Sequence, residues 1–173
     1  MKELRFTDKT LSLRSIKEND TELLFQIYSS TRDEELEKVT SWTSVQKHLF
    51  LQQQFNAQHT YYQHNYTGAN FWIIERKQEP LGRLYLHTAY TDNSIRIIDI
   101  TLLPKWRTRG IGSGILKDII HFAHNANRSV TIHVETFNPA LHLYKKLGFE
   151  IVDKANEVYL LMECTVCKYE SAY

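Results

Sequence analysis

The sequence has two cysteines, no long apolar run and almost no excess of either charge. A formal net charge of +1 over 173 residues provides no general field that would attract nucleic acid or a membrane surface. No apolar run approaches the roughly 18 residues of a membrane helix, and residues 1–8 lack the apolar core of a secretory signal. We therefore expect a soluble, cytoplasmic protein with neither a nucleic-acid nor a membrane partner.

The two cysteines, Cys164 and Cys167, form a single CxxC near the end of the chain. A structural zinc site needs about four ligands, and the sequence has no second pair. A thioredoxin-like CxxC would open a helix after a strand, whereas this one follows a strand-like run. Two reduced thiols are the favoured interpretation, a redox or metal role is the alternative, and no metal is implied.

Periodicity predicts one mixed α/β domain that spans residues 1–173, because strand-like and helix-like segments alternate without a repeat or a flexible linker. The expected strands are 4–14, 71–76, 81–87, 95–103, 130–135 and 157–163. The expected helices are one that Asp20 caps, then 44–66, 110–125 and 138–147, with 29–37 as a turn or a short helix. The apolar face predicted for the long helix consists of Val45, Leu49, Phe55, His59, Tyr62 and Tyr66.

Strand pairing follows from two features of this order. The short loop 77–80 favours an antiparallel hairpin. The run 95–103 is apolar on both faces, which is typical of a central buried strand. Because a helix separates it from the strand 130–135, those two strands are expected to be parallel.

The segment most informative about chemistry joins the run 95–103 to the next helix, which Gly110, Gly112 and Gly114 open. The first N–H groups of a helix have no internal partner, and the helix dipole adds positive charge there. Glycines let an anion approach the backbone, and Arg107 and Arg109 add cationic charge. The segment therefore predicts a phosphate-binding site. It is not a Walker loop, which would need Gly-Lys-Ser/Thr, and it lacks the third glycine of a dinucleotide fingerprint.

Two blocks carry a resemblance to a known family. The pattern Arg-x-x-Gly-x-Gly at 107–112 follows Leu-Leu-Pro and resembles the pyrophosphate loop of the GCN5-related N-acetyltransferase (GNAT) superfamily. Residues 138–149, Asn-Pro-Ala-Leu-His-Leu-Tyr-Lys-Lys-Leu-Gly-Phe, resemble that family's second block. The resemblance covers 70–163 and reaches the N-terminal third only through element order. The run 134–141 is similar to a bacterial subgroup without an agreed substrate.

The resemblance implies a twisted mixed sheet with helices on both faces and a V-shaped split between the strands 95–103 and 130–135. It also implies an N-acetyltransferase that uses acetyl-CoA as co-substrate. In the family, the pantetheine arm lies in the split, here beside Ile100, Thr101 and Leu102. The pyrophosphate would lie on the amides of Thr108, Arg109, Gly110, Ile111, Gly112 and Ser113. Asn138 would contact the pantetheine part, and Tyr144 occupies the position of the general acid.

The implied reaction is direct transfer of acetyl, in a ternary complex, to a primary amine of a small molecule or peptide. A typical lysine amine has a pKa of about 10.4, so a base must remove a proton near neutral pH. Glu135 is the favoured base, through water, and Asp99 is the second candidate. An unpaired buried charge is costly, so Asp99 must have either a partner or a role in the chemistry. We expect His133 to be structural.

Alternatives stay open at this point. The chain could bind acetyl-CoA without turnover, as a sensor or partner-binding module, or use its basic turn as a nucleic-acid module, against which the near-neutral charge counts. The sequence does not identify the acceptor. In the family, the N-terminal helices help form the acceptor pocket, where Ser30, Thr31, Arg32 and Glu35 are candidates. Arg32 would suit an acceptor with a carboxylate. The oligomeric state is not fixed, although dimers are common for such folds.

Overall fold

The computed structural model describes residues 4–154 and 156–166. Its centre is a seven-stranded sheet in the order β1-β2-β3-β4-β5-β7-β6. The strands are β1 (Leu11–Ser15), β2 (Asn70–Arg76), β3 (Glu79–Thr91), β4 (Ser94–Leu102), β5 (Ser129–Glu135), β6 (Glu150–Lys154) and β7 (Tyr159–Cys164). The helices are α1 (Thr21–Ser29), α2 (Asp33–Glu37), α3 (Ser44–Asn65), α4 (Ile111–His124) and α5 (Leu141–Lys146).

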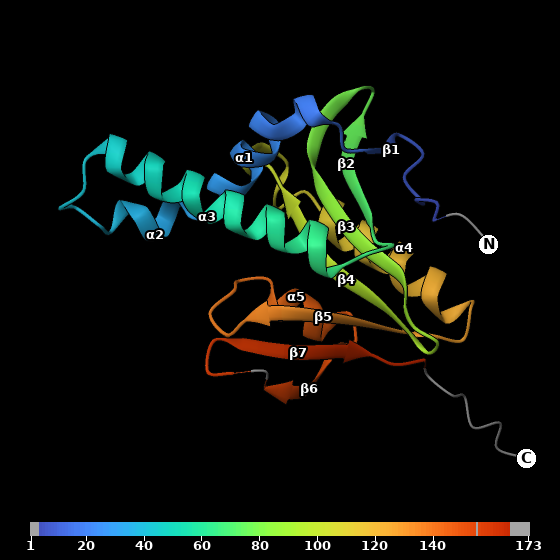
Figure 1. Cartoon of the computed structure of the whole chain (residues 1–173). Coiled ribbons are helices and arrows are strands. Elements are labelled where there is room, and N and C mark those ends of the chain that lie inside the picture. The colour runs from blue at the N-terminus through green and yellow to red at the C-terminus, as the bar shows by residue number, and fades with distance from the viewer. Residues whose placement is uncertain (1–3, 155, 167–173) are drawn as a thin grey trace, which may run out of the picture.

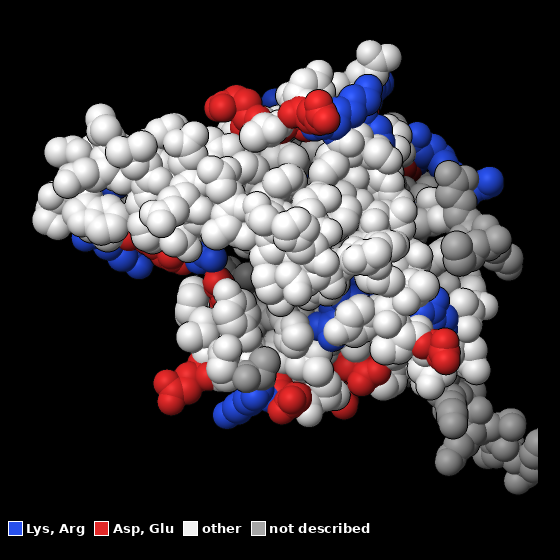
Figure 2. All heavy atoms as spheres, in the orientation of Figure 1, with Lys and Arg blue, Asp and Glu red and all other residues white. Residues whose placement is uncertain are grey.

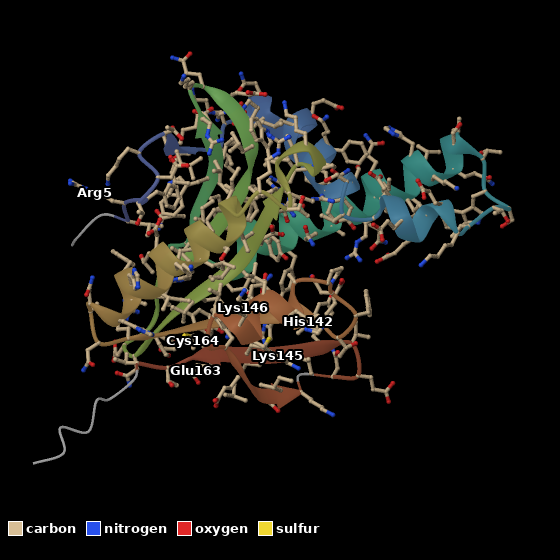
Figure 3. All side chains as sticks on the ribbon, turned by 180° about the vertical axis from the view of Figure 1, so that it is seen from behind. Arg5, His142, Lys145, Lys146, Glu163 and Cys164 are labelled. Atoms are coloured by element: carbon tan, nitrogen blue, oxygen red, sulfur yellow. The ribbon has the colours of Figure 1, made fainter. Side chains whose placement is uncertain are left out.

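The mixed α/β architecture is confirmed. Helices α1 to α3 lie on one face of the sheet, and α4 and α5 lie on the other, as the front and back views show (Figures 1 and 3). Neighbouring strands pair antiparallel except β4 and β5, which are parallel because α4 crosses over between them. One apolar cluster fills the α4–α5 side of the sheet and a second fills the α1–α3 side.

The feature that shapes the site is an opening between β4 and β5. The two strands pair only where Ser94–Ile97 face Ser129–Ile132. Beyond this point β4 carries a bulge at Ile98, since Ile97 faces Leu86 on β3 while Asp99 faces Tyr85. After the bulge, β4 stays paired with β3 and diverges from β5 (Figure 1). The predicted split is therefore present.

Several predicted boundaries at the edges of the sheet were wrong. The first strand covers only Leu11–Ser15, because the Asp8 carboxylate accepts hydrogen bonds from the backbone N–H and hydroxyl of Thr10 and turns the chain there. Strand β6 was not predicted. Its five residues are all exposed, so they show no alternation of buried and polar positions that a pattern could detect.

Helix α3 matches its predicted bounds, but its predicted apolar face is only partly correct. Phe55 is buried as expected, whereas Val45 and Leu49 are exposed and the unlisted Leu51 is buried. The beginning of α3 projects with α2 beyond the sheet (Figure 1), so those turns have no sheet surface to cover.

Two helix starts also differ in detail from the prediction. Asp20 precedes α1 as expected, but its carboxylate does not cap the helix. It instead pairs with Arg14 at 2.7 Å and accepts the backbone N–H of Lys17 at 2.7 Å. Helix α5 begins three positions after Asn138, whose side-chain oxygen accepts the N–H of Ala140 at 2.9 Å and forms a turn first.

Candidate active site

The open edge of β4 forms one wall of the site. Residues 94–97 are buried, and residues 98–101 become half-buried where the pairing with β5 stops. Each strand presents its backbone N–H and C=O groups toward both neighbours. The groups of Ile100, Thr101 and Leu102 that point away from β3 therefore face the opening, where an extended ligand could pair with them.

The start of α4 lies immediately after this edge. Gly110 has a φ of 77°, and Thr108 has a φ of 58°, so the chain makes a tight turn in front of the helix. A Cβ added at Gly110 would meet nothing within 4 Å, and one added at Gly112 would meet only Leu102 Cδ1 at 3.7 Å. The backbone at the start of α4 can thus be approached closely beside the positive end of the helix dipole, which suits a phosphate.

The two arginines of this turn have different roles. The Arg107 guanidinium donates to the Leu102 carbonyl at 2.8 Å and to Ser30 Oγ at 2.7 Å, so it braces the end of β4 against the end of α1. Burial lowers the pKa of Arg107. Arg109 is exposed, and its guanidinium lies 5.4 Å from the centre of the Trp106 ring. Arg109 is thus the more accessible cation beside the helix start.

Tyr144 on α5 is buried, and its ring packs edge-on against that of Phe149 with the two ring centres 5.7 Å apart. Burial, and then the charge of Asp99, raise the pKa of the Tyr144 hydroxyl. The hydroxyl therefore keeps its proton at neutral pH and is available as a donor.

The side-chain oxygen of Asn138 accepts a hydrogen bond within its own turn, from the N–H of Ala140. Its NH₂ group is thus left to donate to a ligand.

Asp99 has a structural partner that the sequence analysis did not identify. Arg83 on β3 holds both of its oxygens, at 2.7 Å and 3.1 Å, and the hydroxyl of Thr101 donates to it at 2.8 Å. Gln58 on α3 accepts from the same guanidinium at 2.9 Å. A charged residue at 83 within an apolar strand, next to the strand that contains Asp99, was the signal available in the sequence.

Glu135 ends β5 and faces the turn between α1 and α2. Arg32 Nη2 lies 2.9 Å from Glu135 Oε1, and the Tyr159 hydroxyl donates to the same oxygen at 3.3 Å. His133 points to a different partner, since its Nδ1 lies 3.0 Å from Arg96 Nη1. Burial, and then the charge of Arg96, lower the pKa of His133.

The predicted residues come from four elements: the edge of β4, the start of α4, the end of β5, and α5 with the turn before it. Of these, the edge of β4 and the end of β5 border the opening. Figure 2 shows the surface hollowed between the projecting α2–α3 part and the β5–β7 part. The view from behind shows α5 on the opposite face of the sheet from α1 to α3, with its residues His142, Lys145 and Lys146 labelled (Figure 3).

In residues 4–154 and 156–166, no three His, Cys, Asp or Glu side chains gather as a metal centre would require. Within those residues, no helix combines the length and apolar character needed to cross a membrane. Cys164 Sγ lies 3.7 Å from the Leu147 carbonyl oxygen, while Cys167 is outside the described residues, so the role of the pair stays a prediction.

Solved structures share this fold. The PaiA N-acetyltransferase of Thermoplasma acidophilum, crystallised with coenzyme A, aligns with a TM-score of 0.64 at 14% identity over 90% of this chain and 98% of that one. The spermidine N-acetyltransferase of Vibrio cholerae, solved with coenzyme A and spermine, aligns with a TM-score of 0.58 at 19% identity over 94% and 99%.

Sequence comparison identifies the family. The probable N-acetyltransferase san of Drosophila melanogaster is 37% identical over 78 residues, which are 42% of this chain and 42% of the fly protein. The human cysteine-rich protein 2-binding protein is 36% identical over 69 residues, which are 38% of this chain but 9% of that protein. The chain thus matches less than half the length of these relatives. The model of the acetyltransferase (GNAT) family matches residues 27–149. The chain belongs to the acetyltransferase (GNAT) family.

Proposed function

We propose that this protein is an N-acetyltransferase that transfers the acetyl group of acetyl-CoA to a primary amine of a small molecule or peptide. The observation that carries the proposal is the open space at the start of α4, directly beside the unpaired edge of β4. Family membership supports acetyl transfer. Two structural relatives were solved with coenzyme A, which supports the same co-substrate here.

The co-substrate would lie along three groups of residues. The diphosphate would accept hydrogen bonds from the N–H groups of 108–113, with Arg109 adding charge. The pantetheine arm would pair with the open backbone edge of 100–102, and the Asn138 amide would donate to it. We also propose that the whole chain forms one acetyltransferase domain, because a single sheet carries both the cofactor side and the acceptor side.

The chemistry requires the acceptor nitrogen to lose two protons and the departing sulfur to gain one. We assign Glu135, acting through water, as the base that takes a proton from the acceptor ammonium. The neutral nitrogen attacks the thioester carbonyl carbon, the new C–N bond forms, and the C–S bond breaks. A backbone N–H at the edge of β4 stabilises the oxyanion, and Tyr144 gives its proton to the departing sulfur. The second proton then leaves the nitrogen through water and restores the Tyr144 hydroxyl. Such proton transfers contribute typically about 10²–10⁴ in rate.

Asp99 is the second candidate for the base. Both of its oxygens accept hydrogen bonds from Arg83, and Oδ1 also accepts from Thr101. In Glu135, Oε2 has only a long contact of 3.5 Å with Arg32 Nη1, so it is the less engaged carboxylate oxygen. We therefore assign Asp99 a supporting part, in which its charge adds to burial in raising the pKa of Tyr144.

The test is release of free thiol from acetyl-CoA in the presence of a panel of amines, with initial rates measured for each. We expect amine-dependent release that Tyr144→Phe lowers without loss of acetyl-CoA binding. Tight binding without release for any amine would instead support a non-catalytic sensor. A homodimer stays a prediction, which sedimentation would check in the same preparation.

A further inference from the structure

Arg32 faces two carboxylates at the acceptor side of the opening. Its Nη2 lies 2.9 Å from Glu135 Oε1, and its Nη1 lies 3.2 Å from Glu35 Oε1. A guanidinium presents its N–H groups in a planar fork that matches carboxylates. The groups that contact its two terminal nitrogens are therefore close neighbours, and one of these groups is Glu135, the proposed base.

The two carboxylates differ in how firmly they are held. The Glu135 side chain is 17% exposed and also accepts from Tyr159, whereas that of Glu35 is 51% exposed. Glu35 lies only three positions from Arg32 along the chain, and exposed pairs of that kind are weak. The position on Nη1 is therefore the exchangeable one, and a ligand can take it without breaking the contact between Arg32 and Glu135.

We propose that the acceptor is a compact zwitterion, an amino acid whose carboxylate replaces Glu35 on Arg32 while its amine lies against Glu135. This inference rests on the proposed function and narrows it. The carboxylate and the amine of the acceptor must be only a few bonds apart, because Arg32 would bind the carboxylate and the adjacent Glu135 would bind the amine. A peptide, whose terminal amine is far from its terminal carboxylate, does not meet this condition.

The less engaged oxygen of Glu135 fits the same arrangement. Oε1 is used by Arg32 Nη2 and by Tyr159, while Oε2 is 3.5 Å from Arg32 Nη1. Oε2 is thus the less engaged oxygen, and it lies beside the nitrogen whose ligand exchanges. The site offers one positive and one negative position side by side, as the two ends of an amino acid require.

The test compares acetylation rates for amino acids and for the amines obtained by removing their carboxyl group, such as phenylalanine and phenethylamine. A hydrogen bond to a charged group is worth about 10- to 100-fold in binding. We expect kcat/KM to favour the amino acid by a factor in that range. Arg32→Ala should remove the preference, and Arg32→Lys should restore part of it.

Glu35→Gln provides the sharpest variant, because it removes the competing carboxylate without touching Glu135. It should lower KM for amino acids and change KM for the matched amines far less. Glu37→Gln, which removes the same charge from another exposed position of α2, is the control and should have no such effect. Retained acetyl-CoA binding shows that each variant is folded.

Failure of the zwitterion proposal can be distinguished from failure of the proposed N-acetyltransferase function. Equal turnover of amino acids and matched amines, a preference for polyamines, or equal effects of Glu35→Gln and Glu37→Gln would overturn the zwitterion and leave the N-acetyltransferase standing. Bound acetyl-CoA with no turnover of either acceptor class would overturn both proposals.

Discussion

Two arginine–carboxylate pairs flank the opening between β4 and β5, and they are held very differently. Arg83 and Asp99 come from neighbouring strands, with side chains 2% and 12% exposed. Arg32 and Glu135 are 103 positions apart in the chain and are 24% and 17% exposed. The enclosed pair fixes the sheet at the point where it splits. The more open pair joins the end of β5 to the turn between α1 and α2, where we propose that a substrate exchanges contacts with it.

The largest expected effect comes from the open pair. Glu135→Gln keeps the shape of the side chain but removes the proposed base, so kcat should fall by about 10²–10⁴-fold. Because Gln keeps the volume of the side chain and can still accept from Arg32, the free energy of unfolding should fall by less than it does when the enclosed pair is broken. Steady-state rates and urea unfolding of one preparation test both statements. A stable variant with unchanged kcat would remove Glu135 from the mechanism.

The enclosed pair should show the opposite profile. Asp99→Ala leaves the Arg83 charge buried without its carboxylate, which typically costs about 3–5 kcal/mol of unfolding free energy. The double change Arg83→Met with Asp99→Leu replaces the pair by apolar side chains and should recover most of this loss. Urea unfolding of the three proteins measures it. If the single change cost less than about 1 kcal/mol, the enclosed pair would not be what fixes the split.

Tyr144 links the enclosed pair to the chemistry. Tyr144→Phe should lower kcat by about 10²-fold with little change in acetyl-CoA affinity, as pre-steady-state rates and calorimetry would show. Burial and the Asp99 charge raise the pKa of Tyr144, so wild-type activity should not fall through ionisation of Tyr144 as the pH rises toward 10. Full turnover by the phenylalanine variant would show that another group protonates the sulfur.

The smallest effect concerns His133, which contacts a third arginine. Its pKa in the folded protein lies below the ordinary value of 6.5, owing to burial and Arg96. The unfolded chain then binds more protons just below pH 6.5, so stability should be full above that pH and decline as the pH falls through it. His133→Gln should flatten this slope in unfolding experiments between pH 5 and 8. An unchanged slope would assign the acid sensitivity to other groups.

Local motifs were predictable from the sequence because their chemistry depends on neighbouring residues. The helix start at Gly110 and the parallel pairing across α4 follow from short-range patterns and from the handedness of crossovers. The partners of Asp99 and Glu135 were not predicted. The charge at 83 within an apolar strand was a signal, but which carboxylates Arg83 and Arg32 meet depends on strand register and helix placement.

Errors in the predicted fold have a similar origin. The early turns of α3 carry apolar residues at helical spacing, yet the sheet does not extend beneath them. Periodicity shows that a face is apolar, but only the tertiary arrangement decides whether anything covers it. The hydrogen bond from Arg107 to Ser30 also joins residues far apart in the chain, so the sequence indicated the charge of Arg107 but not this structural contact.

The central claim is that the start of α4 binds the diphosphate of coenzyme A. Calorimetric titration of acetyl-CoA into Gly112→Glu tests it most directly, with Gly114→Glu as the control of equal charge, since the Gly114 N–H is already donated to Gly110. We expect Gly112→Glu to weaken binding by more than about 100-fold, or about 2.7 kcal/mol, and Gly114→Glu to weaken it far less. Wild-type affinity in Gly112→Glu would contradict the account.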